Sequence, residues 1–174
     1  MEEPVDSTLS DPDSVCLAYL SCPQDGAKGY LGALLLTDRR TRPLHFGYVA
    51  PVRPTVMQRI LYGRTLDIDV KIDVIAKKLA QDGISKVPEV LFVDAEDLLA
   101  ARPIFNVPTA RLTHVEGKQS GVTISTYHYD TGGHAQDQEA VGRIVAALEQ
   151  TVDLLDPFKR MEEALKDAQK DLSK

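Results

Sequence analysis

The chain has 174 residues, of which 43% are hydrophobic and 26% are charged, and its formal net charge is −6. This composition is typical of one globular domain, and the acidic balance disfavours nonspecific nucleic-acid binding, which usually needs a basic excess. No apolar run approaches the ~18 residues of a membrane span, and residues 1–4 lack the pattern of a secretory signal. We therefore expect a cytoplasmic protein that makes no contact with a membrane.

The N-terminal part of the chain predicts an acidic lead-in followed by an antiparallel meander. Residues 1–13 contain five acidic residues, two prolines and no basic residue, which is typical of a disordered segment. Three apolar, β-type runs follow, separated by turn-forming residues, at residues 14–21, 30–37 and 44–49. Cys16 and Cys22 would lie about 20 Å apart along a strand, too far for a disulfide, so we expect two free, buried thiols.

Helices and further strands are expected in the rest of the chain. Pro51 and Pro54 break the third strand, and Pro54 suits the start of a short helix at residues 55–62. The next expected elements are a helix at 69–81, a central parallel strand at 89–93, a helical turn at 97–101, strands at 107–115 and 122–129, and a helix at 138–155. Asp156 and Pro157 then begin a last amphipathic helix, at residues 156–174.

The order of these elements predicts an α+β (or α/β) fold. We expect one domain over residues 14–155, with a mixed sheet, an N-terminal antiparallel meander and a helical C-terminal extension. This order resembles that of the ribonuclease H-like fold, the platform shared by many nucleases and transposases. The resemblance is one of topology, and a shared fold does not by itself imply a function.

The resemblance implies one enzymatic alternative, a divergent metal-dependent nuclease. Such two-metal enzymes need carboxylates that hold metal ions about 4 Å apart, and the family pattern places one acid in the first strand. Residues 14–22 contain no acid. Asp94, at the end of a later strand, matches one expected acid, and it also suits the cap of the helical turn that follows. We therefore expect no complete catalytic site.

A second group of potential metal ligands lies within ten residues: His128, Asp130, His134 and Asp137. These residue types suit zinc or manganese, but their spacing matches no known site and two glycines indicate an exposed loop. The chain also lacks a complete phosphate-binding loop and a Gly-x-Ser-x-Gly motif. We expect neither a bound metal nor a cofactor.

An arginine-rich segment is the strongest functional signal in the sequence. Between Arg39 and Arg64 the chain contains six arginines and no Asp, Glu or Lys. Arginine forks bind carboxylates and phosphates bidentately, and interfaces favour arginine together with tyrosine. The segment therefore predicts a contact surface for an acidic protein or a nucleic-acid backbone, with solvated surface charges as the alternative. The contact residues we expect are Arg39, Arg40, Arg42, Tyr48, Arg53, Arg59, Tyr62 and Arg64.

The last helix carries a narrow apolar seam, formed by Phe158, Met161 and Leu165, on an otherwise charged surface. Two interpretations are open: the seam packs on the domain's own sheet, or it docks into a groove of a partner protein. Together with the arginines, the seam favours a non-catalytic subunit or adaptor of an intracellular multiprotein assembly. The alternatives are the divergent nuclease and a small-molecule sensing domain.

Overall fold

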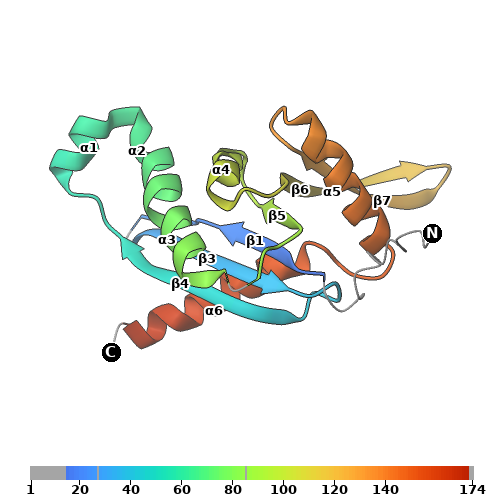
Figure 1. Cartoon of the computed structure of the whole chain (residues 1–174), viewed down its shortest axis with the longest axis horizontal. Coiled ribbons are helices and arrows are strands. Elements are labelled where there is room, and N and C mark those ends of the chain that lie inside the picture. The colour runs from blue at the N-terminus through green and yellow to red at the C-terminus, as the bar shows by residue number, and fades with distance from the viewer. Residues whose placement is uncertain (1–14, 27, 85, 173–174) are drawn as a thin grey trace, which may run out of the picture.

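A seven-stranded mixed sheet forms the centre of the computed structural model, which describes residues 15–26, 28–84 and 86–172 (Figure 1). The strand β1 (Leu17–Ser21) pairs antiparallel with β3 (Gly29–Thr37) and parallel with β5 (Val90–Val93). The other strands are β2 (Gln24–Asp25), β4 (Pro43–Val52), β6 (Thr109–Gln119) and β7 (Val122–Asp130). The sheet order is β2-β3-β1-β5-β6-β7, and β4 pairs with β3. These pairings confirm the expected mixed α+β domain and its antiparallel meander.

Helical segments cover both faces of this sheet. The helical segments before β5 include α1 (Val56–Tyr62), which is exposed, α2 (Leu66–Ile68), a π-helical segment (Asp69–Ala76) and α3 (Lys77–Gly83). A 3-10 helix (Gly63–Thr65) joins α1 to α2, and another (Glu96–Ala101) leads into α4 (Arg102–Phe105). The last two helices are α5 (Ala135–Leu148) and α6 (Asp156–Leu172). The expected lead-in at residues 1–13 lies outside the described residues.

The run from α2 to α3 packs on one face of the sheet. Ile75 of the π-helical segment and Leu79 of α3 contact Leu34 and neighbouring apolar side chains of the strands. The approach is close enough that a Cβ atom on Gly32 would lie 2.1 Å from Ile75 Cγ2. Glycine at position 32 is therefore required by the distance between helix and sheet.

The C-terminal helix α6 packs on the opposite face, together with α5. Met161 and Leu165 are 1% and 4% exposed, and Phe158 lies edge-on to Tyr19 with ring centroids 5.2 Å apart. Arg160 Nη2 also donates a hydrogen bond of 2.6 Å to the Thr41 carbonyl in the β3–β4 turn. The structure thus shows the first of the two arrangements left open by the sequence. The apolar seam packs into the domain's own core, where Met161 and Leu165 are buried and Phe158 is half-buried, and a partner contact of Phe158, Met161 and Leu165 stays a prediction.

Two predicted boundaries are wrong, for identifiable reasons. Pro51 does not break the third strand, because β4 lies outside β3 in the sheet and an edge position tolerates a missing N–H donor. The penultimate helix ends at Leu148 rather than at residue 155. There, Thr151 Oγ1 donates to the Leu148 carbonyl, and the Asp153 carboxylate accepts from the Leu155 amide, which turns the chain toward β7.

The two cysteines agree with the prediction. Cys16 and Cys22 are both free and buried, and burial raises the pKa of each thiol, to about 12 for Cys22. A thiol with such a pKa stays protonated near neutral pH and is a poor nucleophile.

A buried ion pair joins α4 to α5 across the end of the sheet. Arg102 Nε and Nη2 donate to the two oxygens of Asp137 at 2.5 and 2.9 Å, and the Asp137 side chain is only 3% exposed. These hydrogen bonds hold the pKa of Asp137 below its usual value. Asp137 is thus a structural residue in this arrangement.

We predict that Asp137→Asn lowers the free energy of unfolding by about 2 kcal/mol at neutral pH, because the variant loses charge-assisted hydrogen bonds. The depressed pKa gives stability above the unfolded-state pKa of about 3.9, and this stability disappears as the pH falls through the lower folded-state pKa. Urea unfolding of both proteins between pH 7 and pH 3 measures the difference. A difference that does not shrink in acid would contradict this role, and Asp82→Asn, at an exposed helix position, serves as the control.

A second prediction concerns the seam of α6. Met161→Ala should cost about 2–5 kcal/mol, since it leaves a cavity in a closed part of the core. Glu163→Ala, on the exposed face of the same helix, should change stability by no more than about 0.5 kcal/mol. Chemical denaturation, monitored by circular dichroism, measures the stability of both variants. Equal stability of the Met161 variant and the wild type would mean that α6 is not part of the core.

A candidate protein-binding arm

Residues 53–68, which we call the arm, project from the edge of the sheet where β4 ends (Figure 1). The arm contains α1, the 3-10 helix that follows it, and α2. All seven residues of α1 are exposed. This helix therefore receives its stability from local interactions rather than from packing on the body of the domain.

Local sequence explains why α1 forms without tertiary support. Thr55 and Gln58 form a capping box: Gln58 N donates to Thr55 Oγ1 at 3.2 Å, and Thr55 N donates to Gln58 Oε1 at 2.8 Å. Gly63 ends the helix with a φ of 53°, a conformation that glycine adopts at little cost. Short helices are marginal in water, so these two signals define where α1 begins and ends.

The base of the arm is attached to the buried apolar cluster between the sheet and the run from α2 to α3. Leu66 and Val70 are buried there, and the Tyr30 hydroxyl donates a hydrogen bond to Asp67. Burial and this hydrogen bond raise the pKa of Tyr30 to about 12, so the hydroxyl remains a donor at physiological pH. The arm is thus anchored at one end and exposed at the other.

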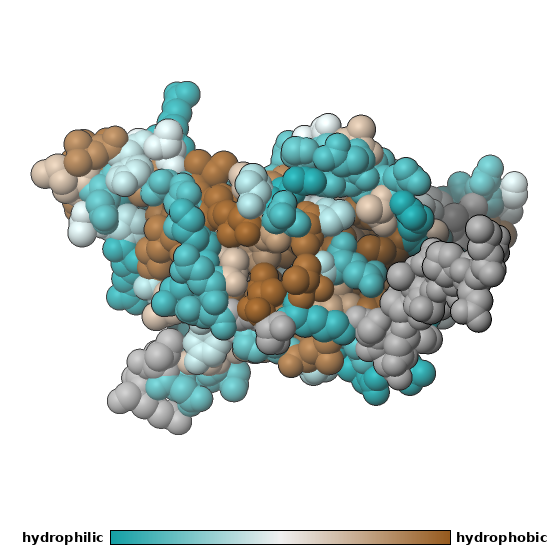
Figure 2. All heavy atoms as spheres, in the orientation of Figure 1, coloured by the Kyte–Doolittle hydropathy of each residue, from teal (hydrophilic) through white to brown (hydrophobic). Residues whose placement is uncertain are grey.

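The exposed part of the arm is unusually apolar. Val56, Met57, Ile60 and Leu61 are 74%, 62%, 69% and 75% exposed. Residues at i, i+1, i+4 and i+5 share one side of a helix, so these side chains form a continuous face. Figure 2 shows this face as hydrophobic surface at the far tip of the molecule, over α1. Exposed apolar patches of this kind mark interaction sites more often than scattered surface residues do.

Three arginines flank the apolar face: Arg53, Arg59 and Arg64, all exposed. Arg53 Nε donates to the Lys28 carbonyl at 3.0 Å, and Arg59 Nε donates to the Pro54 carbonyl at 3.4 Å. None of the three forms an ion pair with a residue that the structure describes. Their charges are available to an anionic partner.

The structure separates the predicted contact residues into different surfaces. Arg39, Arg40 and Arg42 lie in the β3–β4 turn, at the opposite end of β4 from the arm. A strand of ten residues spans roughly 30 Å, so one continuous arginine face over the whole segment is wrong. Arg42 is also engaged locally, since its Nε donates to the Asp38 carboxylate at 2.6 Å.

The predicted aromatic contacts divide in the same way. Tyr62 is 44% exposed and belongs to α1. Tyr48 is 46% exposed but lies on β4, beside Phe46, with ring centroids 6.0 Å apart. Whether these surfaces contact a partner stays a prediction. The four-residue apolar face was missed as a site by sequence reasoning, although Pro54 and Gly63, which isolate α1 from its neighbours, were a usable signal.

The other candidates from the sequence form no assembled centre. Asp94 lies directly after β5 and accepts a hydrogen bond of 2.6 Å from Ser21 Oγ, the last residue of β1. Within the described part of the chain, no group of three or more His, Cys, Asp or Glu side chains is placed to hold a metal ion. The described helices also include none long and apolar enough to cross a membrane. No family model and no curated protein matches the sequence.

The geometry of the arm leads to a stability prediction. Replacing Ile60 and Leu61 together by Ser should change the free energy of unfolding by no more than about 0.5 kcal/mol per site, because neither side chain is buried. Ile75→Ala, in the core beneath α3, should cost about 2–5 kcal/mol. Urea denaturation of the three proteins provides the measurement. A loss of more than about 2 kcal/mol in the double variant would mean that α1 packs on the domain.

Proposed function

We propose that this protein is a non-catalytic adaptor that inserts the apolar face of α1 into a groove of an acidic partner protein. The observation that carries the proposal is the exposure of four large apolar side chains on one locally capped helix. Helix-in-groove recognition uses the spacing found here, with anchors one turn apart. The position of the arm, beyond the edge of the sheet, leaves its face accessible (Figure 1).

Charge favours an acidic partner. The chain has a net charge of −6, yet the arm carries three arginines and one acid, Asp67, which accepts a hydrogen bond from the Tyr30 hydroxyl at the base of the arm. An acidic rim around an apolar groove would pair with these arginines, and arginine is enriched at interface hot spots. Complementary charge would also prevent the arm from binding grooves with a basic rim.

The apolar face distinguishes a protein partner from a nucleic acid. Binding to a phosphate backbone depends on Lys and Arg contacts and gives no role to a helix face of Val, Met, Ile and Leu. An interface between proteins buries such residues at its centre and places charges at its rim. We therefore favour the protein partner over the nucleic-acid backbone, which the arginines alone would also suit.

The test uses a photo-crosslinking amino acid at position 60 of the full chain, expressed in the source cell, with position 163 on α6 as the control. We expect adducts with one acidic protein from position 60, and none with that protein from position 163. The purified partner should then bind the wild type, and Ile60→Ser with Leu61→Ser should weaken binding at least tenfold. An unchanged affinity of this folded double variant would contradict the proposal.

The arginines of the arm give a separate prediction. Replacing Arg53, Arg59 and Arg64 by Ala should weaken binding to the partner by about 1–3 kcal/mol in total, since exposed pairs contribute up to about 1 kcal/mol each. The matched control, Arg39→Ala with Arg40→Ala in the β3–β4 turn, should have no effect. Calorimetry at two salt concentrations measures both. Binding to duplex DNA with a log-affinity slope of about −0.9 per phosphate would favour the nucleic-acid alternative instead.

The nuclease alternative is supported by topology and by one residue. We infer a ribonuclease H-like topology from the order β4-β3-β1-β5-β6, in which β3 runs antiparallel to β1 while β5 and β6 run parallel to it. In this arrangement Asp94 faces Ser21, where a two-metal enzyme would place a second carboxylate. Cleavage of DNA or RNA in magnesium or manganese that disappears in Asp94→Asn would support the nuclease over the adaptor.

A further inference from the structure

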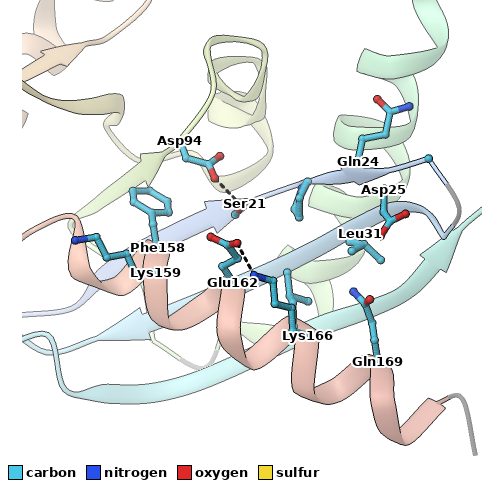
Figure 3. A pocket seen from close by; sticks show the side chains of 13 residues that line it. Ser21, Gln24, Asp25, Leu31, Asp94, Phe158, Lys159, Glu162, Lys166 and Gln169 are labelled. Carbon is cyan, nitrogen blue, oxygen red and sulfur yellow. Dashed lines mark hydrogen bonds and ion pairs between the residues drawn. The ribbon is translucent and has the colours of Figure 1, made fainter.

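A pocket of about 460 Å³ lies between α6 and the ends of β1, β2 and β3, on the face of the sheet opposite α2 and α3 (Figure 3). Its volume lies within the range of small-molecule sites. It also lies at the carboxyl ends of the neighbouring strands β1 and β5. From there the chain continues toward opposite edges of the sheet: the next long strand after β1 is β3, and the next strand after β5 is β6. Crevices at the carboxyl ends of strands at such switch points are the usual ligand sites of open α/β sheets.

Strand register explains why two polar residues meet in this pocket. In the parallel pair, Leu20 is opposite Val93, so Ser21 and Asp94 occupy the next position of each strand. Alternation directs both side chains to the α6 face, following Tyr19 and Phe92 two residues earlier. The result is the hydrogen bond of 2.6 Å from Ser21 Oγ to Asp94 Oδ2.

Asp94 is acted on electrostatically by Lys71, but the Lys71 ammonium is itself ion-paired with Asp97 at 2.7 Å. Glu162 accepts from Lys166 Nζ at 2.8 Å, and Lys28 Nζ donates to Gln169 at the far end, near Asp25. In the described residues, no Lys, Arg or His forms an ion pair with Asp94. Although Asp94 as a whole is exposed, desolvation of its carboxyl by the neighbouring atoms raises the pKa of Asp94, even with the Ser21 hydrogen bond in place.

Apolar side chains form one part of the pocket lining, and polar side chains, most of them from β2 and α6, form the rest. Leu31 of β3 and Leu165 and Phe158 of α6 contribute to its lining. Lys159, the other cation of the lining, extends away from the remaining side chains in Figure 3. The pocket therefore combines the Asp94 carboxylate and an apolar surface that includes an aromatic ring with further charged groups, among them Glu162, which is paired with Lys166.

We propose that this pocket binds a small primary amine with an apolar body, whose ammonium group pairs with Asp94. The ammonium would donate to the Asp94 oxygen that Ser21 does not occupy, and the body would lie against Leu31, Phe158 and Leu165. An anion would meet the Asp94 and Glu162 carboxylates, while Lys166 is already paired with Glu162 and Lys159 extends away from the pocket, so the site should reject it. This inference does not depend on the arm, which lies on another part of the molecule.

Phenethylamine is the probe, with phenethyl alcohol and 3-phenylpropionate as neutral and anionic controls of similar shape. Titration of the full chain, followed by NMR chemical shifts, should show saturable binding of the amine with shifts at Ser21, Asp94 and Leu165. The alcohol should bind at least tenfold more weakly, because it lacks the charge that Asp94 selects. The anion should not bind.

Substitutions show whether the charge of Asp94, rather than the pocket lining as a whole, selects the amine. Asp94→Asn keeps the size of the side chain and should weaken the amine at least tenfold, while leaving the alcohol unchanged. Asp82→Asn, an equal charge change on the exposed surface of α3, should leave all three probes unchanged. Equal binding of amine and anion, or amine binding that survives Asp94→Asn, would overturn the proposal. Absence of amine binding to the wild-type chain at millimolar concentration would also overturn it.

Discussion

The burial of β1 on both faces is the constraint on which the structure depends. Every residue of this strand is buried, because the run from α2 to α3 covers one face and α5 and α6 cover the other. A strand without a polar face has to lie inside a sheet, so β3 and β5 must flank it. The polar groups then appear where the strand ends, at Ser21, and the neighbouring β5 ends beside it at Asp94. One strand thus determines both the layers of the fold and the place of its pocket.

The arm, in contrast to β1, is exposed because its first helix lies beyond the sheet. The helices that cover the sheet need apolar residues facing inward, and the run from Leu66 onward provides them. The preceding helix, α1, begins after β4 has ended, beyond the edge of the sheet. Its apolar face therefore does not lie over any of the described strands. Its capping box and its terminal glycine keep it helical there. The order of the elements along the chain therefore leaves an apolar surface that the described residues do not cover.

More of the architecture than of the candidate sites could be predicted from the sequence. The continuous apolar runs of β1, β3 and β5 and the helical periodicity over residues 69–81 were sufficient, because buried elements carry strong patterns. The boundaries at Pro51 and Leu148 were missed, because an edge position and a side-chain-capped turn depend on neighbours distant in sequence. The exposure of α1 was also missed, because its apolar spacing is that of a packed helix. Pro54 and Gly63, which isolate α1 from its neighbours, were the signal that could have distinguished the two cases.

The π-helical segment at residues 69–76 has a consequence for how the arm is held. A π-helix contains more residues per turn than an α-helix, and such wide turns are rarer and less stable. This segment lies between the base of the arm and α3, and Ile75 anchors it against Gly32. A regular α-helix over the same residues would rotate Leu66 and Val70 about the helix axis, away from the core in which both are buried. The wide turns of residues 69–76 thus set the direction in which the arm leaves the domain, because they let its base and Ile75 pack on the same face of the sheet.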